Sequence, residues 1–196
     1  MKKYLVATVF SLISMAAIAG ESGVFVGLGV GQSNIKLNST DFNYLNTKDE
    51  SDTAFKIYGG YQFNKYLAVE GSYIDFGKAT GSAINIKEKY KVTSYTLAAV
   101  GSLPLGSSGV SLLGKLGVSR NHVKDDYTFK TQSFRYTKTK TDVLWGVGAK
   151  YMVTNNVGIR LEYENLGNAG EPISNADTGT GRSKLALISV GVELKF

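Results

Sequence analysis

The chain has 196 residues and a net charge of +6, with 23 glycines, 12 tyrosines, 9 phenylalanines and no cysteine. The lack of cysteine excludes a disulfide framework and a thiolate metal site, and so small a basic excess gives no support to nucleic-acid binding. The abundance of glycine and aromatic residues, with only 2 prolines, is typical of a β-rich fold.

Residues 1–19 have the layout of a secretory signal peptide. Lys2 and Lys3 precede a short apolar run, which ends at the small-x-small sequence Ala17-Ile18-Ala19. The run is too short to span a bilayer as a helix, and no later segment approaches the roughly 18 apolar residues that a membrane helix needs. We therefore expect cleavage before Gly20 and a single domain over 20–196, without internal repeats, which is either soluble and exported or crosses a membrane as strands.

Eight segments of that domain alternate between apolar residues and polar or small ones, which is the pattern of β-strands. In chain order they cover about 23–36, 53–63, 67–77, 91–103, 110–120, 141–153, 157–166 and 186–196. Each has about the 9–11 residues that a tilted strand needs to cross a membrane.

The charged residues of these segments share one face of each strand, opposite to the apolar face. They are Lys56, Glu70, Lys115, Lys150, Arg160, Glu162 and Glu193. In a soluble sandwich such a face meets water, whereas in a membrane barrel the apolar face meets lipid and the charges line the interior. Alternation alone does not separate the two folds.

The connections between the segments favour the barrel, because short and long ones alternate strictly. The short ones cover about 64–66, 104–109 and 154–156, and the long polar ones cover about 37–52, 78–90, 121–140 and 168–182. An up-and-down barrel has this order, with short periplasmic turns and long outer loops. The prediction is therefore an all-β fold, an eight-stranded antiparallel up-and-down transmembrane β-barrel.

Aromatic residues near the strand ends predict girdles at both membrane interfaces. Those by the short turns are Tyr61, Phe63, Tyr66, Tyr151 and Phe196, and those by the long loops are Tyr73, Phe76, Tyr90 and Tyr163. The general preference of aromatic residues for strands is the alternative explanation.

Three stretches resemble the OmpA-like group of eight-stranded barrels of Gram-negative bacteria, which includes the OmpA transmembrane domain and the opacity-type porins. AFKIYGGYQFNKYLAVEGSY (54–73) is similar to the second hairpin of the OmpA domain, GIRLEYENLGN (158–168) to its seventh strand and SVGVELKF (189–196) to its last strand. The resemblance implies an outer-membrane location and insertion by the barrel-assembly machinery, with Phe196 as the assembly signal. Full-length members also carry a periplasmic peptidoglycan-binding domain, which we expect this chain to lack.

The resemblance also implies a cluster of charges in the lumen, in which Glu70 and Arg160 match the family's third-strand glutamate and seventh-strand arginine. The family's fourth-strand lysine falls at Ala98 or Ala99 and its sixth-strand glutamate at Lys150, so the pairing must differ here. The expected network comprises Lys56, Glu70, Lys115, Lys150, Arg160 and Glu162, with the two glutamates facing Arg160, Lys150 and Lys115. Because an eight-stranded barrel is just wide enough for side chains, we favour a packed ionic core and keep a narrow pore as the alternative.

No catalytic, cofactor or metal site is predicted. The glycine-rich run 27–31 lacks the helix and the acidic residue of a dinucleotide site. His122, the single histidine, lies near Asp125 and Asp126, but no nucleophile stands at a suggestive spacing. We expect it to be a solvated loop residue.

Two of the long loops carry a net positive charge, and four of their lysines are candidates for binding lipopolysaccharide phosphates or acidic host glycans. These are Lys87, Lys89, Lys130 and Lys138. The sequence thus predicts a monomeric, non-enzymatic outer-membrane barrel with a structural role in the cell envelope or a role in surface interaction. The alternatives are a narrow, low-conductance porin and an adhesin that acts through the basic loops.

Overall fold

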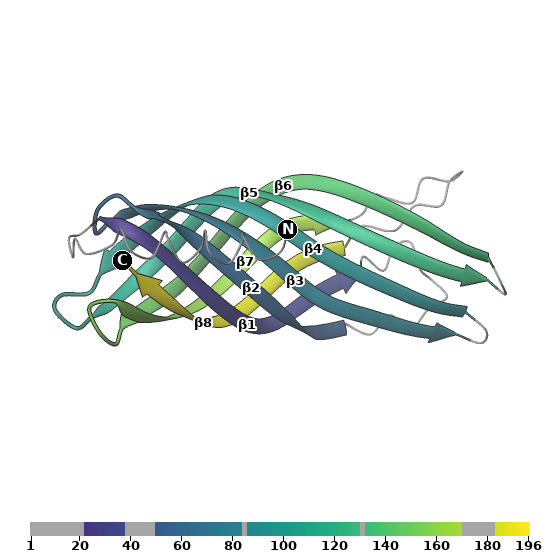
Figure 1. Cartoon of the computed structure of the whole chain (residues 1–196), viewed down its shortest axis with the longest axis horizontal. Coiled ribbons are helices and arrows are strands. Elements are labelled where there is room, and N and C mark those ends of the chain that lie inside the picture. The colour runs from purple at the N-terminus through teal and green to yellow at the C-terminus, as the bar shows by residue number, and fades with distance from the viewer. Residues whose placement is uncertain (1–21, 38–49, 84–85, 130–131, 170–182) are drawn as a thin grey trace, which may run out of the picture.

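The protein is a closed barrel of eight strands, each of which pairs antiparallel with its neighbours in the chain (Figure 1). The computed structural model describes residues 22–37, 50–83, 86–129, 132–169 and 183–196. Its strands are β1 (Gly23–Leu37), β2 (Glu50–Gln62), β3 (Leu67–Ala83), β4 (Ile86–Pro104), β5 (Val110–Phe129), β6 (Gln132–Met152), β7 (Val157–Ala169) and β8 (Ser183–Lys195). β8 pairs with β1, so the sheet has no free edge within the barrel. The predicted fold is confirmed, whereas the predicted signal peptide lies outside the described residues.

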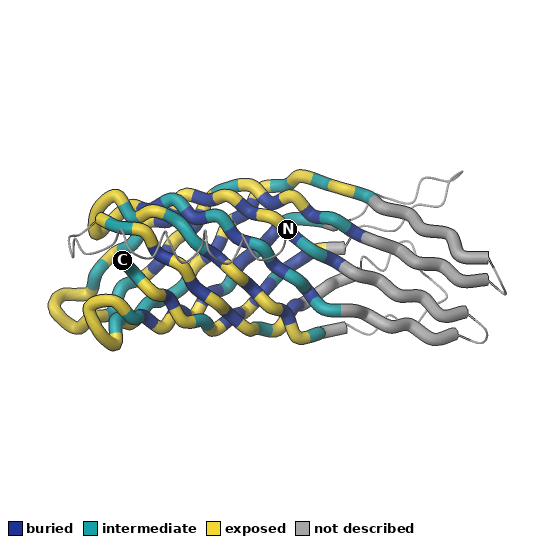
Figure 2. The backbone as a smooth tube through the Cα atoms, in the orientation of Figure 1, coloured by how far each residue is buried: buried dark blue, intermediate teal, exposed yellow. Residues whose placement is uncertain are grey.

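The two faces of each strand differ as the alternation predicted, with apolar side chains outside and polar ones inside. Figure 2 shows buried and exposed positions alternating along the strands. On the outside, Leu28 and Leu116 are each 65% exposed, and the last strand exposes Ile188, Val190, Val192 and Leu194. An exposed apolar belt of this extent around buried charges is the arrangement of a barrel whose outer surface meets lipid. In the described part of the chain, no helix is long and apolar enough to cross a bilayer.

Four strands are much longer than a membrane crossing requires. β3 to β6 have 17, 19, 20 and 21 residues, against 13 to 15 in the other four, and they extend as two hairpins beyond the barrel at the end away from the C-terminus (Figure 1). The prediction of long loops at 78–90 and 121–140 was therefore wrong, because most of these residues lie in strands. Outside the membrane both faces of a strand meet water, so the sequence there loses the apolar alternation that marks a strand. The other two predicted long loops lie largely outside the described residues.

Matching β-bulges interrupt β3 and β7 near the extracellular end of the barrel. Gly77 and Gly167 have φ values of 82° and 78°, which suit glycine. Their backbone N–H groups donate to Asp75 Oδ1 at 3.1 Å and Asn165 Oδ1 at 2.9 Å. A Cβ on Gly167 would lie 2.5 Å from Asp142, so a side chain at this position would clash as well as strain the backbone.

The two bulges share several sequence features at the same spacing. Four residues at the second bulge lie 90 positions after their counterparts at the first. The pairs are Tyr73 and Tyr163, Asp75 and Asn165, Gly77 and Gly167, and Asp52 and Asp142. In both hairpins the glycine of the bulge packs against the aspartate of the preceding strand, Gly77 against Asp52 and Gly167 against Asp142.

Candidate functional site: a charged cluster in the barrel interior

Eight charged side chains point into the barrel because each occupies an inward position of its strand. On β7, Arg160, Glu162 and Glu164 are buried while Leu161 between them is exposed. The other members are Lys56 on β2, Glu70 on β3, Lys115 on β5, Lys150 on β6 and Glu193 on β8. We call these eight residues the ionic cluster.

Arg160 holds three carboxylates of the ionic cluster together. Its Nη1 donates to Glu70 Oε2 at 2.8 Å and to Glu193 Oε2 at 2.7 Å, and its Nη2 donates to Glu162 Oε1 at 2.6 Å. The guanidinium also lies 4.6 Å from the ring centroid of Tyr58, which is within the range of a cation–π contact. A planar group with several donors suits this position better than an ammonium group would.

Two lysines complete the centre of the cluster. Lys115 Nζ lies 2.6 Å from Glu70 Oε1, 2.7 Å from Glu162 Oε1 and 3.1 Å from Glu164 Oε1. Lys56 Nζ lies 2.6 Å from Glu164 Oε2 and 2.9 Å from Glu162 Oε2. The four cations and four carboxylates balance in charge, which matters because an unpaired buried charge costs several kcal/mol.

Five of the six predicted network residues contact one another directly. The sixth, Lys150, contacts none of these five and pairs with Glu193. Lys150 Nζ is 3.1 Å from Glu193 Oε1, whereas the sequence analysis placed it opposite Glu70 and Glu162. Glu164 and Glu193 were not predicted as members of the network, although both lie on the inward-facing side of their strands. Ala98, directly opposite Glu70 on β4, is the inward one of the two alanines considered for the family's lysine position.

Apolar layers flank the ionic cluster on both sides. Along β7 the inward residues run from Arg160 to Glu164 and then to Leu166, and along β2 they run from Tyr58 to Lys56 and then to Ala54. The extracellular layer comprises Ala54, Ile74, Phe76, Val92, Ala98, Val123, Leu144, Leu166, Leu185 and Leu187. The periplasmic layer comprises Phe25, Tyr58, Ala68, Val100 and Leu113. At the extracellular end, packed apolar side chains therefore lie between the solvent and the charges. At the periplasmic end, Lys150 is 12% exposed and lines a hollow of about 730 Å³, while the other charges lie behind Phe25 and Tyr58.

Phe76 was predicted to lie in the outer aromatic girdle and is instead part of the extracellular layer, with 1% exposure. Phe76 lies on the same inward-facing side of β3 as Glu70 and Ile74, which are also buried. The exposed aromatic residues at this level include Tyr95 and Trp145. The ring centroids of Tyr95 and Tyr73 are 5.2 Å apart, and those of Trp145 and Tyr163 are 5.7 Å apart.

The remaining predicted residues lie away from the interior or outside the described residues. Lys87 and Lys89 belong to β4 and Lys138 to β6, not to loops, and Lys130 lies outside the described residues. His122 belongs to β5 and places its ring edge-on against Tyr95 at 5.7 Å. It was expected in a loop, so that prediction was wrong.

Phe196 directly follows β8, and its N–H donates to Val24 O at 2.8 Å, which extends the pairing of the last strand with the first. Lys195 N–H donates to Asn156 O at 2.8 Å on the other side. The end of β8 is thus held between β1 and the turn before β7.

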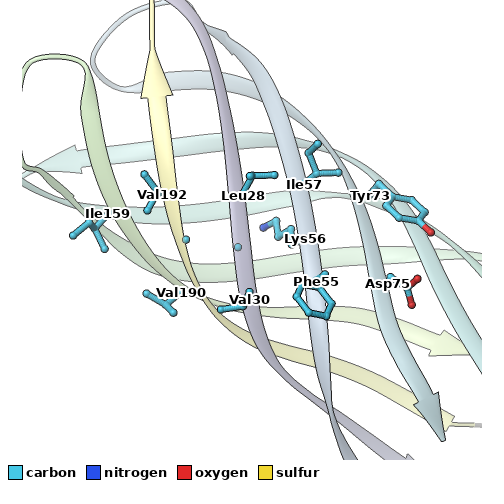
Figure 3. A pocket seen from close by; sticks show the side chains of 12 residues that line it. Leu28, Val30, Phe55, Lys56, Ile57, Tyr73, Asp75, Ile159, Val190 and Val192 are labelled. Carbon is cyan, nitrogen blue, oxygen red and sulfur yellow. The ribbon is translucent and has the colours of Figure 1, made fainter. Parts of the chain in front are cut away.

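A groove of about 690 Å³ crosses the outer surface over β8, β1 and β2. Figure 3 shows it between two rows of side chains, one with Leu28, Ile57 and Val192 and the other with Val30 and Val190. Nearly all of its lining is apolar and belongs to the lipid-facing belt, so the groove is part of the membrane surface. Lys56, a member of the ionic cluster, also borders it.

The closed sheet, the apolar outer belt and the buried charges define an eight-stranded outer-membrane β-barrel. The model of the OmpA-like transmembrane domain matches residues 19–196, and the chain belongs to this family, whose members are generally non-enzymatic. Outer membrane protein P5 of Haemophilus influenzae is 28% identical over the whole chain, and outer membrane protein A of Shigella flexneri is 27% identical. The chain spans only 61% and 56% of these two relatives.

Solved structures support the fold. Ail of Yersinia pestis, crystallised with the heparin analogue sucrose octasulfate, is 23% identical with a TM-score of 0.60, and the match covers 90% of this chain and 99% of that one. Neisserial surface protein A is 17% identical with a TM-score of 0.61, covering 89% of this chain and 99% of that one. At these identities the likeness concerns the fold alone.

Proposed function

We propose that this chain is a non-enzymatic outer-membrane barrel with a sealed interior and a structural role in the cell envelope. The observation that carries the proposal is the position of the centre of the charge-balanced ionic cluster, formed by Arg160, Glu70, Glu162 and Lys115, between two apolar layers. An ion crossing the lumen would have to shed water at Phe76 and Leu166 and then displace ion pairs such as that between Arg160 and Glu70. Each step opposes conduction, because both apolar surroundings and broken buried pairs are costly for a charge.

Ion flux into lipid vesicles tests the seal. Purified protein is refolded into vesicles loaded with a chloride-sensitive dye, and folding is checked by heat-modifiable mobility on a detergent gel. We expect the flux to equal that of protein-free vesicles, while vesicles with an open porin equilibrate at once. Flux clearly above the protein-free level would favour the narrow-porin alternative.

A second candidate function is surface binding of a polyanion through the two projecting hairpins. The observation that favours it is the extension of β3 to β6 beyond the barrel, because Lys87 and Lys89 belong to β4 and Lys138 to β6. Ail, a protein of the same fold, was crystallised with a heparin analogue, so sulfated sugars are a suitable first probe.

Neutralising the four candidate lysines tests this second function. We expect the quadruple variant Lys87→Gln, Lys89→Gln, Lys130→Gln and Lys138→Gln to lose retention on immobilised heparin while the barrel stays folded. The control is Lys65→Gln with Lys195→Gln, which removes two charges at the periplasmic end and should leave retention nearly unchanged, whereas each pair taken from the four lysines should lower it. Equal retention of the quadruple variant and the unaltered protein would reject the adhesin hypothesis.

A further inference from the structure

A hollow of about 730 Å³ lies at the periplasmic end of the barrel. The three short turns and the end of β8 border it, and these segments gather at the end of the barrel where the C-terminus lies (Figure 1). Its wall also carries inward-facing residues from the ends of the strands, which include Ser102 on β4, Ser111 on β5 and Lys150 on β6. We call this space the periplasmic hollow. Its size falls within the range of small-molecule sites in proteins.

The periplasmic hollow is rich in groups that donate hydrogen bonds. Lys65, Lys150 and Lys195 line it, and the lining residues that the structure describes include no aspartate or glutamate. Ser102 and Ser111 add two hydroxyl groups. Ammonium groups bind phosphate as point charges, and hydroxyl groups donate to its oxygens. This set of donors suits a compact anion with several oxygens.

Lys150 links the periplasmic hollow to the ionic cluster. Its Nζ donates to Glu193 Oε1 at 3.1 Å, and Glu193 is the one carboxylate with which it pairs among the described residues. By contrast, Lys115 at the centre of the cluster lies within 3.1 Å of three carboxylates. An ammonium group has three N–H donors, so Lys150 has two that can serve a molecule in the hollow.

Glu193 does not depend on Lys150 alone for its counter-charge. Arg160 Nη1 donates to Glu193 Oε2 at 2.7 Å. Lys150 can therefore turn toward an anion in the hollow while Glu193 remains paired, which avoids the high cost of an uncompensated buried charge. The ionic cluster thus supplies one cation to the periplasmic hollow and keeps its other three at the centre.

We propose that the periplasmic hollow binds the phosphate group of a small periplasmic solute, with Lys150 as the principal cation. A phosphate ester carries a charge of about −1.5 to −2 near pH 7 and three strong acceptor oxygens, which match several ammonium and hydroxyl donors better than a carboxylate does. The hollow is larger than a phosphate group, so inorganic phosphate and a phosphate ester both fit. It lies inside the ring of strands, away from the lipid-facing belt. The site goes beyond the proposed sealed barrel and does not depend on whether the lumen conducts.

Calorimetric titration of the refolded full chain in a phosphate-free neutral detergent buffer tests the binding. Inorganic phosphate is added in one arm and glucose 6-phosphate in the other. We expect saturable binding in at least one arm, and the arm with the higher affinity tells whether free phosphate or an ester is the preferred ligand. Absence of saturable binding in both arms would overturn the proposal.

Substitution of Lys150 tests the residue that carries the site. Lys150→Gln should lower the affinity for phosphate about tenfold or more, because it removes a charged hydrogen-bond donor. The matched control is Lys140→Gln on the same strand, which removes a lysine that pairs with Asp142 toward the extracellular end and should keep the affinity within about twofold. Equal affinities of Lys150→Gln and Lys140→Gln would overturn the proposal.

A second variant leaves the ionic cluster intact and covers the case in which Lys150→Gln does not fold. Ser111 lies directly opposite Lys150 in the pairing of β5 with β6. Ser111→Asp therefore places a carboxylate beside the ammonium group and should abolish saturable phosphate binding. Unchanged affinity of this variant would contradict the assignment of the site.

Spin labels locate the bound phosphate independently of affinity. The chain has no cysteine, so Ser107→Cys, in the turn between β4 and β5, and Thr139→Cys, toward the extracellular end of β6, each accept a single nitroxide label. We expect the label at position 107 to broaden the phosphorus NMR signal of bound phosphate and the label at position 139 to leave it sharp. Equal effects of the two labels, or a larger effect at position 139, would overturn the proposal.

Discussion

Replacing Arg160 with methionine is expected to lower the free energy of unfolding by about 3–5 kcal/mol, the usual cost of removing one partner from a buried ion network. The side chain is 3% exposed and donates to Glu70, Glu162 and Glu193, so its loss leaves three buried carboxylates short of a cation. Unfolding by urea in lipid vesicles can be followed by the fluorescence of Trp145, the only tryptophan of the chain.

A surface pair provides the matched control for Arg160. Lys140 lies 4.0 Å from Asp142, and its side chain is 31% exposed. Exposed pairs of this kind contribute about 0–1 kcal/mol, so Lys140→Met should change stability within that range. The double variant Arg160→Met with Glu70→Gln should lose less than the sum of the single losses, since the two residues share one interaction. Equal, small losses for Arg160→Met and Lys140→Met would contradict the account of the ionic cluster.

Deleting Phe196 is expected to reduce the amount of protein in the outer membrane more than any single substitution in the lumen. β8 closes the barrel against β1, and Phe196 adds the last hydrogen bond of that pairing, to Val24. The resemblance of the final strand to other barrel strands adds a role in recognition by the barrel-assembly machinery. Levels are measured in fractionated membranes, with heat-modifiable mobility as the measure of folding.

The variant Phe196→Tyr is the control for the deletion, because it keeps an aromatic ring and the same length of strand. Its outer-membrane level should stay close to that of the unaltered protein. Normal levels of the deletion variant would show that the terminal residue is dispensable for insertion. Arg160→Met should insert better than the deletion variant, because its effect falls on stability after the strands have reached the membrane.

The alternation of residues predicted the eight strands because the membrane imposes it. Val190 and Val192 on β8 face lipid, so their neighbours Ser189, Gly191 and Glu193 must face the interior. Where the strands leave the membrane this constraint ends, and the lysine- and threonine-rich start of β6 looks like a loop in the sequence. The parts of β3 to β6 beyond the membrane were missed for this reason.

The alternation along each strand predicts which charged residues belong to the ionic cluster, but it does not predict which of them pair with one another. Glu164 and Glu193 have the inward parity of their strands and were still left out of the predicted network. Lys150 was assigned to Glu70 and Glu162, whereas the stagger of β6, β7 and β8 brings it beside Glu193. Stagger depends on how all the strands close into a barrel, and the alternation within one strand carries no information on it.

The sealed interior is tested most directly by the current through a planar bilayer that holds the refolded protein. Insertion is verified by recovering heat-modifiable protein from the membrane, and an open porin provides the positive control. The account predicts a current that stays at the level of the bare bilayer at both polarities, because Phe76 and Leu166 on one side and Phe25 on the other enclose the paired charges. Reproducible stepwise conductance from the unaltered protein would contradict it and would establish the lumen as a pore.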